Sequence, residues 1–213
     1  MNWASVLAIA ATMLLSSRLP AQNAQVGIVL PARTQLASEP PAVRSSSLIT
    51  DGATLDLLRN GFPARLHYTM ERWTTGGWFD GIAAEAQWDV VVRYDALGKA
   101  FHVYRVARGR TSLLGVFATV AEADAALGAP FQAPIAPPKP GQRGYYSLVL
   151  DIEALSLTEL DELEQWLRGD LKPAVRGSKN AGTAVGRGVR TIVVRLLGGE
   201  KRRYEARSPT FRP

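Results

Sequence analysis

Residues 64–73, Ala-Arg-Leu-His-Tyr-Thr-Met-Glu-Arg-Trp, and residues 84–95, Ala-Glu-Ala-Gln-Trp-Asp-Val-Val-Val-Arg-Tyr-Asp, carry the pattern that decides the fold. Through most of both stretches, apolar side chains occupy every second position and polar side chains stand between them. A period of two is that of a β-strand with one buried face. We therefore expect two strands here. Their buried faces comprise Leu66, Tyr68 and Met70 in the first, and Ala84, Ala86, Trp88, Val90, Val92 and Tyr94 in the second.

The strand pattern continues on either side of this pair. Residues 95–99 form a tight polar turn into a strand at 100–106, and Arg108-Gly-Arg110 leads into another at 113–117. Short strands joined by short polar turns favour an antiparallel meander with one face on a core. Further strands are expected at 26–30, 145–154 and 201–207.

Capping signals predict short helices between the strands. Thr50 and Gly61 bracket the first, and capping boxes begin at Thr119 and Ser156, each with a glutamate three positions later. Apolar side chains at helical spacing predict a fourth helix. The expected helices cover residues 50–59, 119–128, 156–169 and 185–197. The proline-rich stretch 130–140 is expected to be a stiff surface connector rather than a strand.

These elements predict a mainly β (α+β) protein, with an antiparallel sheet or two-layer β-sandwich covered by three or four short helices. The expected organisation is a signal peptide at 1–21, an extended lead-in with an edge strand at 22–47, and a single β-rich domain at 48–213. A chain of 213 residues without cysteine can bury a sizeable core. The absence of cysteine excludes disulfides, thiolate metal sites and a cysteine nucleophile.

The N-terminal apolar run from Ala4 to Leu15 indicates export. It is shorter than the roughly 20 residues that span a bilayer, but it suits the core of a secretory signal. Pro20 breaks the run and Ala21 offers a small residue for cleavage, so the mature chain is expected to begin at Gln22. An uncleaved anchor is the alternative. With no transmembrane segment expected after cleavage, the predicted location is the periplasm or the extracellular space.

Positive charge is concentrated towards the C-terminus. Residues 170–213 carry 11 basic and 3 acidic side chains, whereas residues 22–169 carry 13 basic and 16 acidic ones. Such asymmetry indicates an anionic partner, and export disfavours nucleic acid. A solvated basic face that only aids solubility is the alternative. The candidate contacts with an anionic surface are Arg187, Arg190, Arg195, Arg202 and Arg203.

Two large aromatic residues mark a candidate protein contact. Trp78 and Phe79 follow Gly76 and Gly77 at the tip of the hairpin expected between the first two strands. Strand alternation does not bury side chains at such a tip. These residues either contact a partner or fold back to plug the end of the sheet.

Signals for catalysis are weak. His67 and His102 are the two histidines, too few for a local zinc site, and no Gly-x-Ser-x-Gly turn accompanies them. Asp89 and Asp95 share the polar face of one strand, and Glu71 is expected opposite them on its neighbour. We expect a cross-strand salt-bridge ladder there rather than acid–base chemistry. No catalytic residue, cofactor or metal is assigned.

Three segments carry a resemblance to a known family. They are Leu58-Arg-Asn-Gly-Phe-Pro-Ala-Arg-Leu-His-Tyr68, Trp88-Asp-Val-Val-Val-Arg-Tyr-Asp95 and Phe117-Ala-Thr-Val-Ala-Glu122. In order and spacing they resemble, over residues 45–155, a family of exported bacterial proteins catalogued only as a domain of unknown function. The genes of such families often lie beside a sensor histidine kinase of the nitrogen-regulation type, which implies a part in envelope signalling. The stretch 171–213 departs from the tryptophan-rich ending of many members.

The sequence therefore predicts an exported, non-enzymatic protein that acts in envelope interactions or as an accessory to sensing. Its expected partner is an envelope protein or an anionic surface. The alternative is a periplasmic hydrolase that uses the strand carboxylates.

The export prediction can be checked by sequencing the N-terminus of secreted protein. We expect the mature chain to begin at Gln22 or within a few residues of it, because the small residue at position 21 follows the end of the apolar run. Recovery of chains with an intact Met1 in the membrane fraction would instead support the uncleaved anchor.

Overall fold

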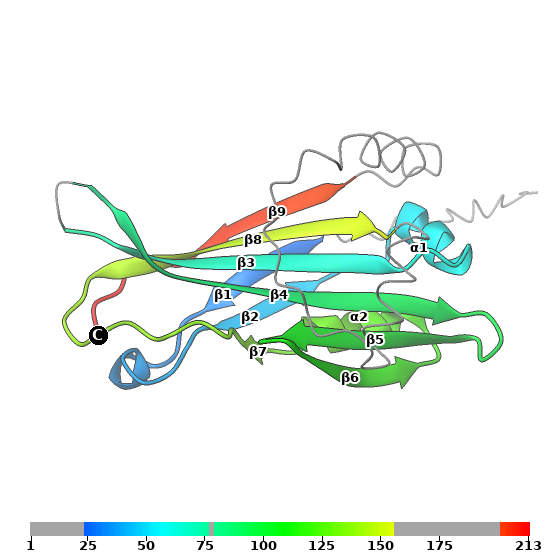
Figure 1. Cartoon of the computed structure of the whole chain (residues 1–213), viewed down its shortest axis with the longest axis horizontal. Coiled ribbons are helices and arrows are strands. Elements are labelled where there is room, and N and C mark those ends of the chain that lie inside the picture. The colour runs from blue at the N-terminus through cyan, green and yellow to red at the C-terminus, as the bar shows by residue number, and fades with distance from the viewer. Residues whose placement is uncertain (1–23, 77–78, 156–200) are drawn as a thin grey trace, which may run out of the picture.

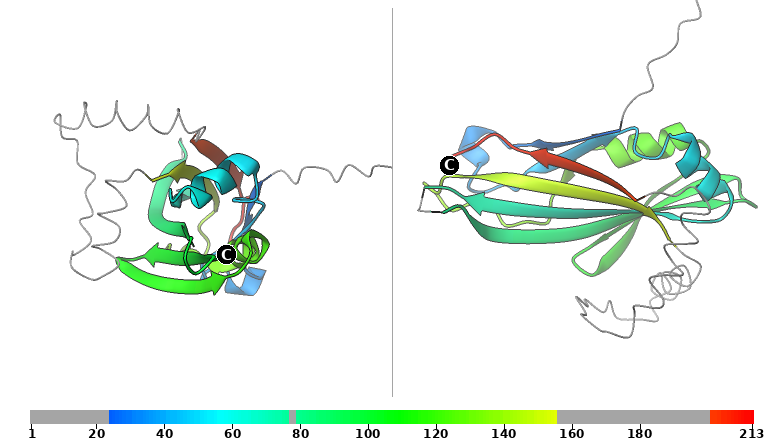
Figure 2. Two further views of the ribbon diagram at one scale, coloured as in Figure 1. Left: turned by 90° about the vertical axis from the view of Figure 1, so that its right-hand side faces the viewer. Right: turned by 90° about the horizontal axis from the view of Figure 1, so that it is seen from above.

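The computed structural model describes residues 24–76, 79–155 and 201–213. Two antiparallel sheets face each other across one apolar core, which confirms the predicted mainly β fold (Figures 1 and 2). Two α-helices and one short 3₁₀ helix accompany them within the described residues. The helices expected at 156–169 and 185–197 lie outside those residues.

The larger sheet has six strands in the order β6-β5-β4-β3-β8-β9, all antiparallel to their neighbours. They are β3 (Ala64–Thr74), β4 (Gly81–Asp95), β5 (Ala100–Ala107), β6 (Arg110–Phe117), β8 (Gly144–Ala154) and β9 (Arg202–Arg207). The first four form the predicted meander. β8 then pairs with the other side of β3, so β3 is bonded along its whole length on both sides.

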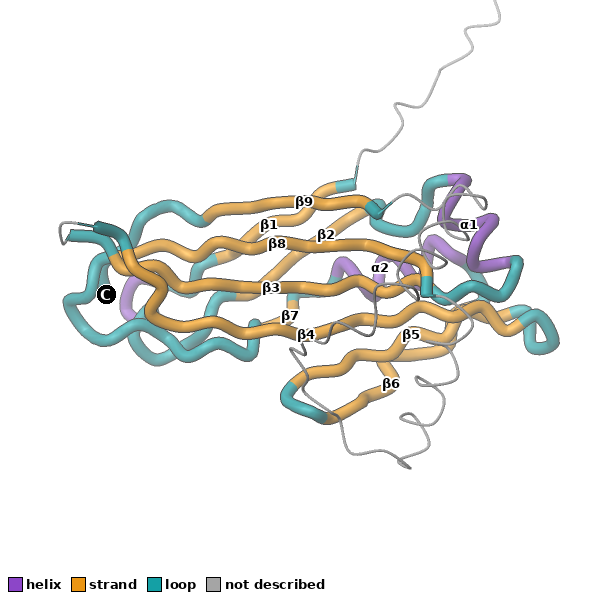
Figure 3. The backbone as a smooth tube through the Cα atoms, turned by 45° about the horizontal axis from the view of Figure 1, so that its top comes forward, coloured by secondary structure: helices purple, strands orange, loops and turns teal. Residues whose placement is uncertain are grey.

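The smaller sheet, in the order β1-β2-β7, corrects two expectations (Figure 3). β1 (Gln25–Val29) is the predicted edge strand, but β2 (Ala42–Ser46) lies in the segment expected to be an extended lead-in. β7 (Phe131–Gln132) lies in the expected proline-rich connector. Pro41 precedes β2 rather than interrupting it, so the strand keeps its hydrogen-bond donors. Val43 of β2 is buried, so the lead-in belongs to the same packed unit as the larger sheet.

Local capping explains the two α-helices. Asp51, not Thr50, caps α1 (Gly52–Arg59), and its carboxylate accepts the Thr54 N–H at 3.0 Å. The predicted capping box opens α2 (Val120–Gly128), with Thr119 and Glu122 exchanging hydrogen bonds between side chain and backbone. The 3₁₀ helix η1 (Arg33–Gln35) joins β1 to β2. Both α-helices lie towards the end of the sandwich opposite the C-terminus (Figure 1).

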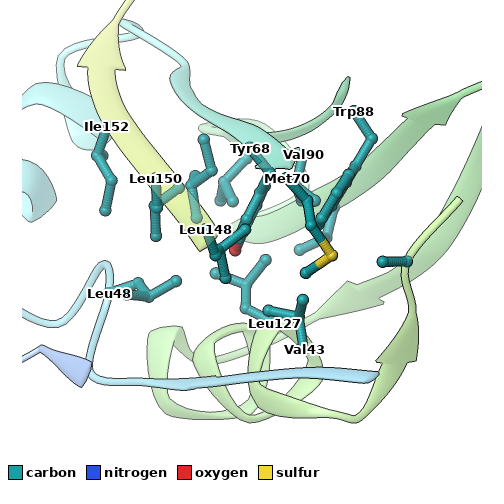
Figure 4. Packing of buried hydrophobic residues seen from close by; sticks show 14 of the residues in the cluster. Val43, Leu48, Tyr68, Met70, Trp88, Val90, Leu127, Leu148, Leu150 and Ile152 are labelled. Carbon is teal, nitrogen blue, oxygen red and sulfur yellow. The ribbon is translucent and has the colours of Figure 1, made fainter. Parts of the chain in front are cut away.

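Apolar side chains fill the space between the sheets (Figure 4). The predicted inward residues of β3, Leu66, Tyr68 and Met70, are all buried. The Tyr68 ring stacks on Trp88, with 5.0 Å between centroids, and Trp88 meets Phe131 of the smaller sheet. Residues that complete the buried cluster include Val43, Leu48, Val90, Leu127, Leu148, Leu150 and Ile152.

One buried carboxylate joins α2 to the chain that leaves the smaller sheet. Asp124 of α2 accepts the backbone N–H groups of Ser47 and Leu48 at 2.8 Å and of Ile49 at 3.2 Å. Three donors that follow β2 therefore find their acceptor on a helix that follows β6. Charge-assisted hydrogen bonds of this kind are stronger than neutral ones.

Removal of the Asp124 carboxylate should destabilise the protein strongly. Asp124→Ala leaves the three N–H groups without that acceptor, and we expect a loss of about 3 kcal/mol or more in the free energy of unfolding. Asp124→Asn keeps one acceptor oxygen, so its free energy of unfolding should fall by less. Urea unfolding of both variants measures this, with Glu122→Ala at the exposed helix cap as the control, expected to cost about 1 kcal/mol. If Asp124→Ala lost less stability than Glu122→Ala, the stabilising role of the Asp124 carboxylate would be contradicted.

Candidate functional site

The β3–β4 hairpin extends at one end of the sandwich (Figure 1), and large apolar side chains beside its turn are exposed. Phe79 is 89% exposed and Ile82 is 52% exposed. Of the two outcomes expected for the aromatic pair, Phe79 therefore does not plug the end of the sheet. Trp78 lies outside the described residues.

The base of this hairpin is held by stacking and by a close strand contact. Trp73 stacks on Tyr145 with 6.0 Å between ring centroids, and the Arg207 guanidinium lies 3.5 Å from the Tyr145 ring centroid. The Trp73 indole N–H also donates to Glu71 at 2.8 Å. A Cβ at Gly144 would collide with the Trp73 carbonyl oxygen, so only glycine permits this approach of β8 to β3. The tip is thus presented by an ordered stem.

The structure describes two of the five arginines expected to meet an anionic surface. Arg203 is exposed and forms an ion pair with Glu205 at 3.0 Å. Arg202 is used within the fold: it donates to Asp51 at 2.6 Å, to the Thr54 hydroxyl at 2.7 Å and to the Leu48 carbonyl at 3.0 Å. Arg202 therefore ties β9 to the start of α1 and is a poor candidate for an external anion. Arg187, Arg190 and Arg195 lie outside the described residues.

Cross-strand ion pairs lie on the outer face of the larger sheet, and of the carboxylates expected to form a ladder they include Asp89. Arg65 of β3 contacts Asp89 of β4 at 2.8 Å and Glu153 of β8 at 3.6 Å. Lys201, just before β9, lies 3.3 Å from Asp151 of β8. These ion pairs join β3, β4 and β8 with the residue before β9, and Asp89 is the candidate carboxylate that takes part in them.

His67 sits in a chain of side chains that superficially resembles a catalytic relay. Its Nδ1 lies 2.8 Å from the Asp89 carboxylate, and its Nε2 lies 3.4 Å from the Thr69 hydroxyl. A relay of this type needs a carboxylate that orients the histidine, and Asp89 fits that part. However, the same Asp89 oxygen also accepts Arg65 Nε at 2.8 Å. These side chains are half-buried on the outer face of the larger sheet, and they do not line the pocket at the C-terminal end of the sandwich.

Asp89 is held in its ionised form. Burial pushes the pKa of Asp89 upward, but the hydrogen bonds from His67 and Arg65 and the charge of Arg65 outweigh it, so the net pKa is lowered. A general acid at neutral pH needs the opposite shift. Asp89 can therefore orient His67, but it cannot serve as a proton donor near neutral pH.

The remaining candidate carboxylates are tied to their own strands or turns. Glu71 faces Glu85 in the β3–β4 register rather than Asp89 or Asp95, so two like charges stand opposite each other here and the expected ladder does not extend to this pair. Glu71 accepts from Trp73, and Glu85 accepts from the Gln87 amide at 2.7 Å. Asp95 caps the β4–β5 turn, where backbone N–H groups lower its pKa. Glu71 and Glu85 thus bind side chains of their own strands and Asp95 binds turn N–H groups, so these contacts do not create a shared acid–base pair.

An open pocket with a volume of about 410 Å³ lies at the C-terminal end of the sandwich, and the sequence analysis missed it. Leu30 and Pro31 contribute from the end of β1, and Leu36 from the turn after η1. Arg33 and Arg212 stand among these apolar residues. The full lining is Leu30, Pro31, Arg33, Leu36, Pro209, Thr210, Phe211 and Arg212. The two contributing segments are far apart in sequence, so no local pattern could reveal their meeting.

Within the described residues, no group of three or more histidine or acidic side chains could hold a metal ion. That part of the chain also contains no helix long and apolar enough to cross a membrane.

Fold and surface together define a β-sandwich protein with an exposed apolar hairpin tip and a cationic pocket at the same end. Comparison with known proteins finds no matching family model, no matching curated protein and no matching solved structure. The resemblance to exported proteins of unknown function therefore stays a prediction.

Acid should weaken the fold partly through Asp89. Because its pKa in the folded state lies below the unfolded value of about 3.9, its ionic contacts stabilise the fold fully above about pH 5 and are lost as pH falls through the lowered pKa. Urea unfolding between pH 7 and pH 3 should show a steep loss of stability for the unaltered protein and a shallower loss for Asp89→Asn. Equal slopes for the two proteins would show that Asp89 does not drive the pH dependence.

Proposed function

We propose that this protein is an exported, non-enzymatic binding protein of the cell envelope, which contacts its partner through the tip of the β3–β4 hairpin. The single observation that carries the proposal is the 89% exposure of Phe79 on an ordered stem. Large aromatic side chains are costly to leave in water, and they are enriched at the centres of protein contacts. The short apolar run near the N-terminus supports export.

A role as an accessory to sensing is the finer part of this proposal, and it rests on the resemblance to exported proteins encoded beside sensor kinases. An anionic surface is a second possible partner, through Arg203 and the arginines at 187, 190 and 195. Such binding would depend steeply on salt, because exposed charges are screened beyond about 8 Å at physiological ionic strength.

A periplasmic hydrolase that uses the strand carboxylates is the alternative from another class. The Thr69-His67-Asp89 chain is the observation that favours it. Against it, Asp89 is paired with Arg65 and keeps a lowered pKa. The pocket at the C-terminal end, where a substrate could be shielded from water, is also not lined by His67, Thr69 or Asp89.

Replacement of the aromatic pair should separate binding from stability. We expect Trp78→Ser with Phe79→Ser to abolish capture of the envelope partner and to change the free energy of unfolding by only about half a kcal/mol, because Phe79 is exposed. Affinity capture of the mature protein from its own envelope, followed by mass spectrometry, measures the first effect. Thermal unfolding measures the second.

The matched control is Leu97→Ser. Leu97 is 97% exposed at the β4–β5 turn, at the other end of the sandwich. This variant removes an equally exposed apolar side chain and should capture the same partner as the unaltered protein. A large drop in melting temperature for the double variant would place the pair in the core. Loss of capture in both variants would show that the effect is not specific to the tip.

A further inference from the structure

The pocket at the C-terminal end combines an apolar lining with two cationic side chains. Five of its eight lining residues are apolar: Leu30, Pro31, Leu36, Pro209 and Phe211. The Phe211 ring packs on the buried Tyr146 ring, with 5.1 Å between centroids, so this wall of the pocket is anchored in the core. Its volume of about 410 Å³ lies in the lower part of the range of small-molecule sites, about 300–1,000 Å³.

The two guanidinium groups in the lining have no acidic partner among the described residues. Arg212 Nε donates to the Gly141 carbonyl at 3.2 Å, which fixes the side chain and leaves its other donors available. Arg33 is exposed in η1. The nearby Glu39 carboxylate accepts from Gln35 instead, at 2.9 Å. A guanidinium presents its N–H groups as a fork that matches a carboxylate.

A third positive charge, that of Arg72, is linked to the pocket through residues 141 and 142. Arg72 is only 7% exposed and donates to Gln142 at 2.8 Å, next to the Gly141 that holds Arg212. No acidic side chain among the residues the structure describes forms an ion pair with it. A buried charge is screened much less than an exposed one, so Arg72 adds to the attraction of an anion at this end.

We propose that this pocket binds a small amphipathic carboxylate, with the carboxylate on Arg33 and Arg212 and a short apolar chain against Leu30, Leu36 and Phe211. Neither a purely apolar nor a purely ionic ligand satisfies both halves of the lining. This inference goes beyond the proposed contact through the hairpin tip and does not depend on it.

The test uses the whole mature protein and decanoate as the probe, titrated by calorimetry below the concentration at which it forms micelles. Decanoate should bind at a single site, and decanol, which has the same chain without the charge, should bind at least about tenfold more weakly. Arg33→Gln with Arg212→Gln should weaken decanoate by about tenfold or more. Both residues are exposed, so the double variant should fold.

The control is Arg44→Gln with Arg59→Gln, which removes the same charge at exposed positions outside the pocket. It should bind decanoate as the unaltered protein does, and so should Phe79→Ser, whose effect on partner capture tests the hairpin tip separately. Failure of decanoate to bind would overturn the inference. So would equal binding of decanol, equal weakening in the control, or tighter binding of decyl phosphate.

Discussion

The carboxylate of Asp124 is the interaction on which the arrangement of the two sheets depends. It accepts three consecutive backbone N–H groups just after β2, while its own helix follows the last strand of the meander. The same helix closes on β2 at a second point, where the Ser45 hydroxyl donates to the Leu127 carbonyl at 3.0 Å. A Cβ at Gly128 would lie 2.6 Å from the Ser45 carbonyl oxygen, so glycine is required for this approach. Polar contacts of fixed geometry thus set how the sheets meet, and apolar packing fills the space that they define.

The two ends of the molecule differ in how the polar groups of their connecting segments are satisfied. Near Asp124, the helices and the Arg202 contacts with Asp51 and Thr54 satisfy the polar groups of the connecting segments internally. At the C-terminal end, the connecting segments meet through backbone hydrogen bonds, such as Thr75 N–H to Arg143 and Gly144 N–H to Phe211. The hairpin tip and the cationic pocket are both built on that second end. Binding residues are commonly carried on loops that a rigid scaffold positions, and this sandwich has that form.

The regular elements could be predicted from the sequence, because their signals are local. Alternation along β3 and β4 specified which residues point inward, and the Thr119 capping box specified the start of α2. β2 could not be found in this way, since its five residues follow two prolines and gain their stability from pairing with β1 and β7. Arg202 looked like one more residue of a basic tail, because its partners lie about 150 positions earlier. The pocket was missed because its lining also joins segments that are far apart in sequence, residues 30–36 and 209–212.

The distribution of charge differs between the outer sheet face and the C-terminal end. On the outer sheet face, the described acidic groups near His67 are matched by Arg65 or Lys201, so their charges stabilise pairing between strands. At the other end, Arg72 is buried without an ionic partner in the described part of the chain, and its Nε and the Tyr146 hydroxyl have no hydrogen-bond partner there. Burial raises the pKa of Tyr146 to about 12, although the charge of Arg72 opposes the rise. A buried charge without an ionic partner is costly, even though the Arg72 guanidinium keeps its hydrogen bond to Gln142, and a well-packed apolar residue would avoid that cost. A fold that keeps this cost beside its pocket and its exposed tip follows the general pattern in which local rules of stability are broken at functional sites.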